Sequence, residues 1–338
     1  MPSNQQIVLD NRPQGEAVAS NFKLVTIDTP ALKDGEVLVC HHFLSLDPYM
    51  RGRMNESKSY AASQGLGEVM IGGTVGEVAD SKHPKYAVGD KVVGMGGWQE
   101  YSVVDGNAVG ALRKVDTTHV PLSHYLGAVG MPGVTAYYGL VKIIAPKAGN
   151  TVVVSAATGA VGSAFVALAK ARGCRVVGIA GGAEKCGYAV NELGFDACID
   201  YKEHSDVKAM SKALKEACPD GIDGYFENVG GWIMDAVMLR MNAFSRIAMC
   251  GMIAGYNGAP LPMTNPALIL MNRMKIEGFI VSEHMEVWPD ALQELGTLVA
   301  TGKLRPRETV AEGIAAAPEA FLGLLKGKNF GKQLVKLN

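Results

Sequence analysis

Apolar and polar positions alternate in blocks along residues 151–251, and these blocks predict strands and helices in turn. Short apolar runs predict strands at 151–155, 175–180, 197–200, 224–227 and 246–250. Segments with helical spacing of apolar residues predict helices at 161–171, 185–193, 207–217 and 233–241. Apolar strands that alternate with helices are typical of a doubly wound parallel sheet, so we predict an α/β fold for this part of the chain.

The first part of the chain has a different pattern, in which short strands are separated by glycine turns. The predicted strands there are 36–46, 72–79, 90–95 and 98–104. This spacing indicates a compact antiparallel barrel or sandwich. Residues 127–140 are expected to form a helix pair, and 331–337 a strand that returns to the first domain. The predicted domains are therefore 1–126 with 308–338, and 127–307.

The turn after the strand 151–155 is the clearest functional signal. It places Ala157, Gly159 and Gly162 in the slots of the G-x-G-x-x-G/A dinucleotide fingerprint, with alanine at the first glycine. The helix that starts at Ala160 and Val161 would present backbone N–H groups and a dipole that attract phosphate. A tight strand–helix turn that binds no ligand would use similar residues, so this motif needs support from its context.

The tip of the strand 175–180 indicates which dinucleotide is bound. An NAD site usually places Asp or Glu about 20 residues past the turn, where it binds the ribose 2′-OH. The segment GIAGGA (178–183) has no carboxylate, while Lys185 and Tyr201 follow within reach. We therefore expect a 2′-phosphate and favour NADPH over NADH; the alternative is that Lys185 is an ordinary solvated lysine.

Composition and charge narrow the class of protein. The 338 residues carry a formal net charge of −1, with acidic and basic residues well mixed. This balance disfavours nucleic-acid or membrane-surface partners. The polar N-terminus lacks the apolar core of a signal peptide, and no apolar stretch approaches about 18 residues. We expect a cytoplasmic protein with a small-molecule partner.

Neither cysteine nor histidine spacing predicts a metal site. The six cysteines occur singly, without a C-x-x-C pair, and no histidines have metal-ligand spacing. Reduced, buried cysteines are the expectation for a cytosolic chain.

Several motifs along the chain resemble those of one known family. They are LDPYMR (46–51), GMPGVTAYYGL (130–140), AATGAVGS (156–163), ENVGG (227–231) and NFGK (329–332). In this order they resemble the medium-chain dehydrogenase/reductase superfamily. Within it, they are similar to the zinc-independent NADPH double-bond reductases: leukotriene B4 12-hydroxydehydrogenase/prostaglandin reductase, plant alkenal reductases and bacterial curcumin reductase. The resemblance implies a GroES-like antiparallel β-barrel domain beside a Rossmann domain. It also implies reduction of the C=C bond of α,β-unsaturated aldehydes and ketones.

Tyr256 is the candidate catalytic residue. It follows the strand 246–250, close to the carboxyl edge of the sheet, where ligands bind in such folds. Its hydroxyl is expected to order the nicotinamide ribose or to donate a hydrogen bond or proton, as the resemblance implies for a tyrosine in a matching segment. A packed loop tyrosine is the alternative. The proline-containing loop 258–266 is expected to border the substrate.

Further site residues follow from the resemblance. Tyr49 and Tyr60 are expected at the substrate pocket, with core packing as the alternative for Tyr49. The residues expected to contact the cofactor are Asn228, Asn329, Met131 and Thr135, in addition to those of the 157–162 turn, Lys185 and Tyr201. Met131 and Thr135 would line the cofactor cleft, although Thr135 could instead serve inside a helix.

Other functions stay open at this point. A quinone reductase of the same superfamily suits the same active-site plan, and a secondary alcohol dehydrogenase is a weaker option. A non-catalytic NADPH-binding protein is the alternative outside enzymes. A homodimer is expected, with the apolar helix 267–274 at its seam and residues 281–282 extending the sheet across it.

Overall fold

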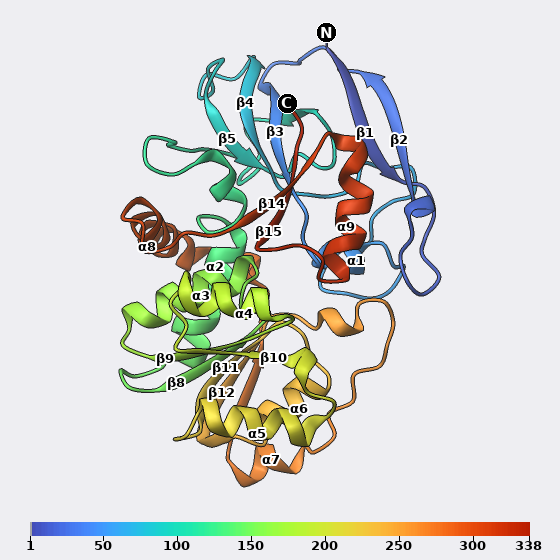
Figure 1. Cartoon of the computed structure of the whole chain (residues 1–338). Helices are drawn as coiled ribbons and strands as arrows, with labels where there is room; N and C mark the ends of the chain where they lie inside the picture. The colour runs from blue at the N-terminus through green and yellow to red at the C-terminus, as the bar shows by residue number, and fades with distance from the viewer. Residues whose placement is uncertain (1) are drawn as a thin grey trace. The chain divides into compact units, whose positions relative to one another are not determined.

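The computed structural model describes residues 2–338, which divide into two compact units (Figure 1). The β-rich unit combines the chain up to Leu126 with Glu308–Asn338. The α/β unit is Gly127–Arg307. Within residues 2–338, none of the helices has both the length and the apolar character that crossing a membrane requires.

A six-stranded parallel sheet forms the centre of the α/β unit, with the order β10-β9-β8-β11-β12-β13. Its strands are β8 (Thr151–Ser155), β9 (Arg175–Ala180), β10 (Ala197–Asp200), β11 (Ile222–Glu227), β12 (Met241–Met249) and β13 (Lys275–Gly278). The chain builds outward from β8 to β10 and then returns to add β11 beside β8. The strand order therefore reverses between β8 and β11, and ligands of such sheets bind at this switch point.

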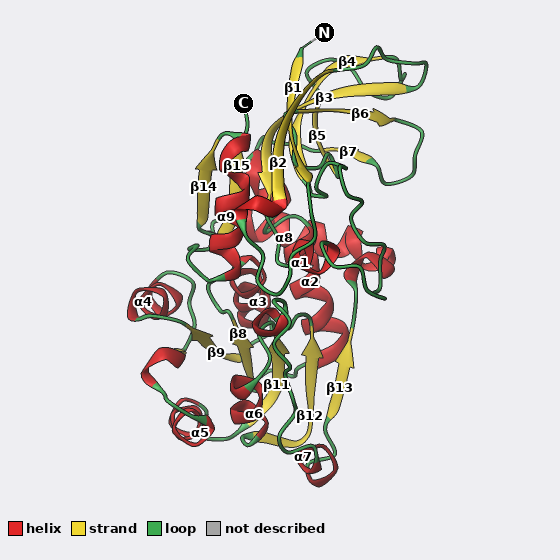
Figure 2. Cartoon of the chain, turned by 90° about the vertical axis from the view of Figure 1, so that its right-hand side faces the viewer, coloured by secondary structure: helices red, strands yellow, loops and turns green. Residues whose placement is uncertain are grey.

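Helices cover both faces of this sheet. They are α2 (Met131–Tyr138), α3 (Ala160–Ala171), α4 (Ala183–Asn191), α5 (Val207–Ala217), α6 (Trp232–Met238), α7 (Ala267–Met271) and α8 (Trp288–Ala300). Helices α2, α3 and α8 pack together, and α5 packs on α6 (Figure 2). The sequence thus folds as the predicted doubly wound sheet.

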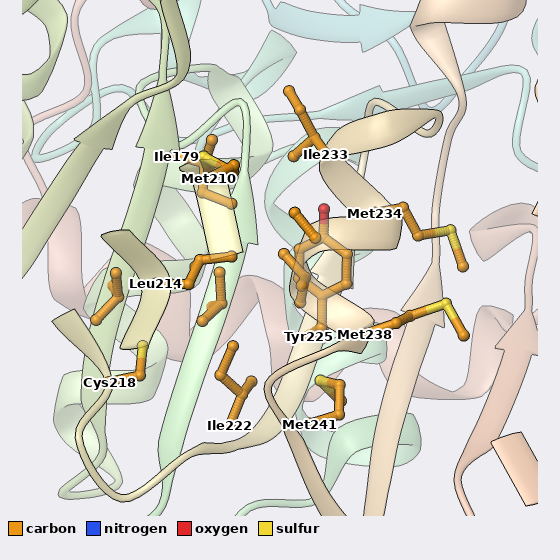
Figure 3. Close-up of a cluster of buried hydrophobic side chains, with 14 of the residues drawn as sticks. Ile179, Met210, Leu214, Cys218, Ile222, Tyr225, Ile233, Met234, Met238 and Met241 are labelled. Atoms are coloured by element: carbon orange, nitrogen blue, oxygen red, sulfur yellow. The ribbon is translucent and has the colours of Figure 1, made fainter. Parts of the chain in front are cut away.

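Successive residues of the central strands serve the two faces in turn. Tyr225 of β11 packs with Met210 and Leu214 of α5 and with Met234 of α6 in one buried cluster (Figure 3). The next residue, Phe226, packs edge-on against Phe165 of α3, with ring centroids 5.3 Å apart. This alternation is the period-2 geometry of a strand buried on both sides.

The β-rich unit contains a seven-stranded sheet and a separate antiparallel strand pair. The pair is β1 (Ser3–Leu9) with β2 (Phe22–Asp28). The sheet has the order β14-β15-β3-β4-β5-β7, with β6 paired to β3. Its strands are β3 (Glu36–Ser45), β4 (Thr74–Ser81), β5 (Lys91–Gly94), β6 (Tyr101–Asp105), β7 (Leu112–Lys114), β14 (Glu308–Glu312) and β15 (Lys332–Lys336). All neighbours are antiparallel except β14 and β15, which run parallel.

The predicted return of the C-terminal strand is confirmed. Figure 1 shows the red strand β15 beside the blue strand β3, and the two pair antiparallel. Lys332 of β15 is 4% exposed in its side chain and forms an ion pair of 3.0 Å with Asp47, which follows β3. Two short helices complete the unit: α1 (Tyr49–Arg53) and α9 (Ala317–Leu325). Phe321 of α9 packs edge-on against Trp98, with centroids 5.5 Å apart.

Two local expectations are wrong. The predicted helix pair at 127–140 contains one α-helix, α2, because Gly130 before it is extended, with φ −142° and ψ −158°. Residues 281–282 do not extend the sheet; they lie in a 3₁₀ helix, Val281–Glu283, and β13 forms the edge. Phe279 explains this, since its ring packs on Tyr138 and Phe226, with centroids 5.2 and 6.2 Å away.

Candidate cofactor-binding and active site

The β8–α3 turn has the close-packed form that a pyrophosphate cradle requires. Ala156 has a left-handed backbone, with φ +51°, and Ala157 donates its N–H to Ile179 O at 3.0 Å. Gly159 precedes α3 and has no capping side chain, so the first N–H groups of the helix face outward from the turn. A Cβ on Gly162 would lie 2.4 Å from Ala157 O, so only glycine lets α3 approach the turn this closely.

Glycine at position 178 compensates for the alanine in the first fingerprint slot. Ala157 is fully buried, and a Cβ on Gly178 of β9 would lie 2.7 Å from its methyl group. Phe195 fills the other side of the same position. The cradle therefore fits a bound pyrophosphate in spite of the substitution, because the neighbouring strand supplies the missing space.

Lys185 and Tyr201 follow the ends of two neighbouring strands: Lys185 lies in α4, the helix after β9, and Tyr201 comes directly after β10. The Tyr201 ring lies against Gly181, where an added Cβ would be 2.8 Å from Tyr201 Cε1. Lys185 is in the first turn of α4, and its pKa is lowered by burial and by the nearby charge of Lys202. This corner thus gathers two lysines and a phenol, a donor set that suits a phosphate monoester.

Contrary to the expectation from the sequence, a carboxylate does lie at the tip of β9, and it comes from the neighbouring strand β10. Asp200 at the end of β10 accepts hydrogen bonds from Gly182 N at 2.8 Å and from Lys202 N at 3.0 Å. Because one of its oxygens holds these two backbone groups together, Asp200 organises the loop at the β9 tip.

A buried carboxyl network, which the sequence analysis missed, joins the ends of β8 and β11. Glu227 is fully buried, and its carboxyl accepts hydrogen bonds from Ser155 Oγ at 2.7 Å, Tyr225 Oη at 2.8 Å and Val229 N at 2.5 Å. Burial raises the pKa of Glu227, although these donors oppose the rise. The signal in the sequence was a charged residue directly after the apolar pair Tyr225 and Phe226 at the end of a predicted strand.

This network fixes the position of Asn228. The Asn228 N–H donates to Ser155 Oγ, and its side-chain amide donates to Ser155 O, both at 2.8 Å. Its carbonyl accepts from Ile253 N at 3.2 Å. Asn228 is therefore tied to the end of β8 and to the segment after β12, which places it at the switch point of the sheet.

Tyr256 reaches the same edge. It follows the 3₁₀ helix Ile253–Gly255, and Met252 N donates to its hydroxyl oxygen at 3.4 Å. A Cβ on Gly251 would lie 3.1 Å from Tyr256 Oη and 3.4 Å from Asn228 O. The phenol and Asn228 thus both lie beside Gly251, at the carboxyl ends of β11 and β12.

The loop 258–266 packs over this region. Leu261 covers two glycines, since a Cβ on Gly230 or on Gly255 would be 2.9 Å from Leu261 Cδ1. Thr264 N donates to Asp235 Oδ1 of α6 at 3.2 Å. One end of the loop is therefore anchored on α6, and its middle packs on Gly230 of the ENVGG segment and on Gly255.

The structure also describes the other predicted residues of the α/β unit. The hydroxyl of Thr135 donates to Met131 O, one turn earlier in α2, at 2.8 Å. The hydroxyl proton of Thr135 is thus used within the helix, which is the alternative role expected for this residue. The hydroxyl oxygen can still accept a hydrogen bond from a ligand. Met131 is the first residue of α2 and is partly exposed.

Three predicted residues belong to the β-rich unit. Tyr49 begins α1, and its pKa is raised by burial and by Asp47. The ring of Tyr60, which is 54% exposed, lies under the guanidinium of Arg53 at 5.4 Å from the ring centroid. Asn329 donates its side-chain N–H to Gly331 O at 2.7 Å and borders a cavity of about 300 Å³ lined mainly by β14 and α9.

Within residues 2–338, no three side chains of His, Cys, Asp or Glu lie together in a way that could hold a metal ion. All six cysteines of the sequence are free thiols.

Comparison with known proteins places this geometry in a family. A family described as "N-terminal domain of oxidoreductase" matches residues 5–112, and one described as "Zinc-binding dehydrogenase" matches residues 160–297. The chain is 48% identical to a putative NADP-dependent oxidoreductase, YfmJ, of Bacillus subtilis, over 99% of this chain and 98% of that protein. It is 44% identical to the NADPH-dependent curcumin reductase of Escherichia coli, over 99% and 97% of the two chains.

A plant relative and a solved structure agree with these matches. The NADP(+)-dependent 2-alkenal reductase of Nicotiana tabacum is 42% identical over 99% of this chain and 98% of its own. CurA from Vibrio vulnificus, solved in complex with NADPH, has a TM-score of 0.91 and 45% identity over 99% of both chains. The expected resemblance is therefore confirmed: the chain belongs to the medium-chain dehydrogenase/reductase family, in the branch that contains curcumin reductase, prostaglandin reductase 1 and 2-alkenal reductase.

Proposed function

We propose that this protein is an NADPH-dependent reductase of the C=C bond of α,β-unsaturated aldehydes and ketones. The observation that carries the proposal is the similarity, along the whole chain, to relatives named for reductions of curcumin and 2-alkenals. The cradle at the switch point supports it independently, since Gly162 and the uncapped start of α3 suit a pyrophosphate.

The residues of the α/β unit divide the binding of NADPH among them. The turn Ala157–Gly162, with the N–H groups of Ala160 and Val161, would hold the pyrophosphate. Lys185 and Tyr201 would hold the 2′-phosphate, since lysine and phenol donors converge there. Asn228, Thr135 and Met131 would contact the rest of the cofactor, with Asn329 from the β-rich unit. When bound, NADPH supplies a hydride for the β-carbon of the substrate.

The protein's own task is to stabilise charge and to deliver a proton. As the β-carbon gains a hydride, negative charge develops on the carbonyl oxygen, and a hydrogen-bond donor at that oxygen lowers the barrier. Tyr256 is the donor that we assign, because its hydroxyl lies at the carboxyl edge beside Asn228. A proton then adds to the α-carbon and completes the saturated carbonyl product. Tyr49 and Tyr60 are assigned to the substrate pocket.

Several broader features belong to the same proposal. We assign NADPH binding to residues 127–307, and the substrate side to 1–126 with 308–338. We propose catalysis without zinc, which the lack of a gathered donor set among residues 2–338 supports. A homodimer is supported by the edge position of β13 and by the exposed Leu270 and Met271 of α7. The six unbridged cysteines support a cytoplasmic location.

The test is a panel of acceptors with both nicotinamides. NADPH oxidation is followed at fixed enzyme concentration with trans-2-alkenals, aryl enones and quinones, and the reduced products are identified by mass spectrometry. We expect turnover of enals and enones with NADPH, much slower turnover with NADH, and a saturated carbonyl product. Preferential turnover of quinones, or tight NADPH binding without turnover of any acceptor, would contradict the proposal.

A further inference from the structure

Two cysteines of the α/β unit bring their sulfur atoms into contact. Cys186 lies in α4 and Cys198 in β10, and their Sγ atoms are 3.1 Å apart. Both residues are partly exposed. A disulfide bond is about 2.05 Å long, so the start of α4 would have to move only slightly towards β10 to form it.

The two thiols have different chemical roles. The thiol of Cys198 donates a hydrogen bond to the sulfur of Cys186. This bond lowers the pKa of Cys186, and burial and Asp200 oppose that change. The same bond raises the pKa of Cys198, with burial, Cys186 and Asp200 acting in the same direction. Because the thiolate is the nucleophile, these pKa directions favour Cys186 as the attacking thiol and Cys198 as the resolving thiol.

We propose that Cys186 and Cys198 form a reversible dithiol–disulfide site that hydroperoxides oxidise, and that the disulfide weakens NADPH binding. The second half of this proposal rests on the proposed function. In the first step the Cys186 thiolate attacks a peroxide oxygen, the O–O bond breaks, and the departing oxygen takes a proton to leave as water or an alcohol. Cys186 becomes a sulfenic acid.

In the second step the sulfur of Cys198 attacks the sulfur of Cys186. The S–O bond breaks, and the hydroxide leaves as water with the proton of the Cys198 thiol. The two thiols together lose two electrons and two protons, and the peroxide accepts both. A dithiol reductant reverses the change by thiol–disulfide exchange.

The link to the cofactor comes from where the two cysteines lie. Lys185 directly precedes Cys186 in the first turns of α4. β10 ends two residues after Cys198 at Asp200, whose carboxyl holds Gly182 N at 2.8 Å and is followed by Tyr201. Closing the sulfur distance from 3.1 Å to about 2.05 Å draws α4 towards β10. This movement displaces Lys185 relative to Tyr201, the pair assigned to the 2′-phosphate.

The first measurement detects the disulfide without using the cofactor. The full-length protein is treated with hydrogen peroxide, its free thiols are blocked, and peptides are analysed by mass spectrometry without reduction. We expect a linked peptide that joins Cys186 to Cys198 and disappears after dithiothreitol. Cys186→Ser and Cys198→Ser should each abolish it. Cys40→Ser, which removes a partly exposed thiol of the β-rich unit, should leave it unchanged. Absence of the linked peptide in the wild type would overturn the proposal.

The second measurement tests the consequence. Dissociation constants for NADPH and NADH are compared between reduced and oxidised protein, with Cys198→Ser treated in parallel. We expect oxidation to weaken NADPH binding by about fivefold or more, a typical coupling between sites, with NADH little changed. Equal NADPH affinity of both forms would overturn the second half. A reduced protein that does not prefer NADPH would refute the cofactor assignment instead, and the linked peptide would still decide the first half.

Discussion

The methyl group of Ala157 occupies the space that a side chain on Gly178 would need, since a Cβ added to Gly178 would lie 2.7 Å from Ala157 Cβ. Ala157 stands in the dinucleotide turn, and Gly178 stands in the neighbouring strand β9. The two residues are complementary: Ala157 in the turn has a methyl group, and Gly178 in the strand has no side chain to clash with it. A change at either position should therefore depend on the residue at the other.

The first prediction is that Gly178→Ala destabilises the protein by about 1–3 kcal/mol, because the added methyl group overpacks a buried strand. Ala157→Gly in the same chain should recover part of this loss. Urea unfolding of the wild type, both single variants and the double variant measures the coupling. Gly187→Ala is the matched control, since its Cβ meets only the end of Asn191, at 4.0 Å. Strictly additive effects of the two changes would contradict the pairing.

The second prediction concerns cofactor choice. Lys185→Ala should weaken NADPH binding by about 10- to 100-fold, the range for loss of a charged hydrogen bond, and leave NADH binding nearly unchanged. Fluorescence titration with both nicotinamides measures this. Lys212→Ala removes an exposed lysine from α5 and should change neither affinity. If Lys185→Ala reduced both affinities equally, the lysine would not be recognising the 2′-phosphate.

The third prediction concerns the phenol at the carboxyl edge. Tyr256→Phe should lower kcat about 100-fold or more, because it removes the hydroxyl that we propose as the hydrogen-bond donor to the developing oxyanion. The dissociation constant for NADPH should stay within a small factor of the wild type. Steady-state kinetics with a trans-2-alkenal provides kcat, and fluorescence provides the dissociation constant. The control is Tyr86→Phe, which removes a hydroxyl that donates to Leu112 O at 2.8 Å in the β-rich unit. An unchanged kcat in Tyr256→Phe would exclude the assigned role.

The fourth prediction concerns the buried Glu227 and pH. Its pKa in the folded protein is raised above the ordinary 4.5 by burial. The Glu227 carboxyl therefore loses its proton at a lower pH in the unfolded chain than in the folded protein. As the pH rises from about 4.5 through the raised pKa, the free energy of unfolding decreases. The stability of the wild type relative to Glu227→Gln should accordingly decrease from about pH 4.5 upward.

Urea midpoints of both proteins over this pH range measure the effect. Glu216→Gln, which changes an exposed carboxylate of α5, is the control and should follow the wild type at every pH. A wild type that gained stability over Glu227→Gln with rising pH would show that the carboxyl is ionised more easily when folded than when unfolded.

The fifth prediction concerns zinc. Among residues 2–338, the His, Cys, Asp and Glu side chains do not gather into a group that could hold a metal ion. Prolonged dialysis against a strong chelator should leave the reductase activity and the unfolding midpoint unchanged. Elemental analysis before and after dialysis checks that the chelator had metal to remove. Loss of activity that added Zn²⁺ restores would contradict zinc-independent catalysis.

The local pattern of apolar and polar residues was sufficient to predict many of the helices and strands of the α/β unit. Residues 175–180, 197–200 and 207–217 have the predicted bounds, because short apolar runs and helical spacing of apolar residues are local signals. In the β-rich unit, β1 and β2 were not anticipated. β2 is largely exposed after Phe22, so its sequence lacks the apolar alternation of a half-buried strand.

The candidate site was only partly predictable, since several of its contacts join distant segments. Asp200 was overlooked at the β9 tip because strand pairing, not sequence order, brings it to Gly182. The links from Glu227 to Ser155 span 72 positions. The need for glycine at position 178 could not be predicted from the sequence, because it comes from the contact with Ala157. The roles of Tyr256, Lys185 and the remaining site residues stay predictions that the experiments above test.

The position of β15 affects how the protein is made in the cell. The ribosome finishes residues 127–307 before it adds the strand that carries Lys332, yet Asp47 waits near the start of the chain for that lysine. The early segment therefore leaves the ribosomal tunnel with the edge of β3 that pairs with β15 still unpaired. Chaperone dependence during synthesis should accordingly concentrate on the N-terminal third of the polypeptide.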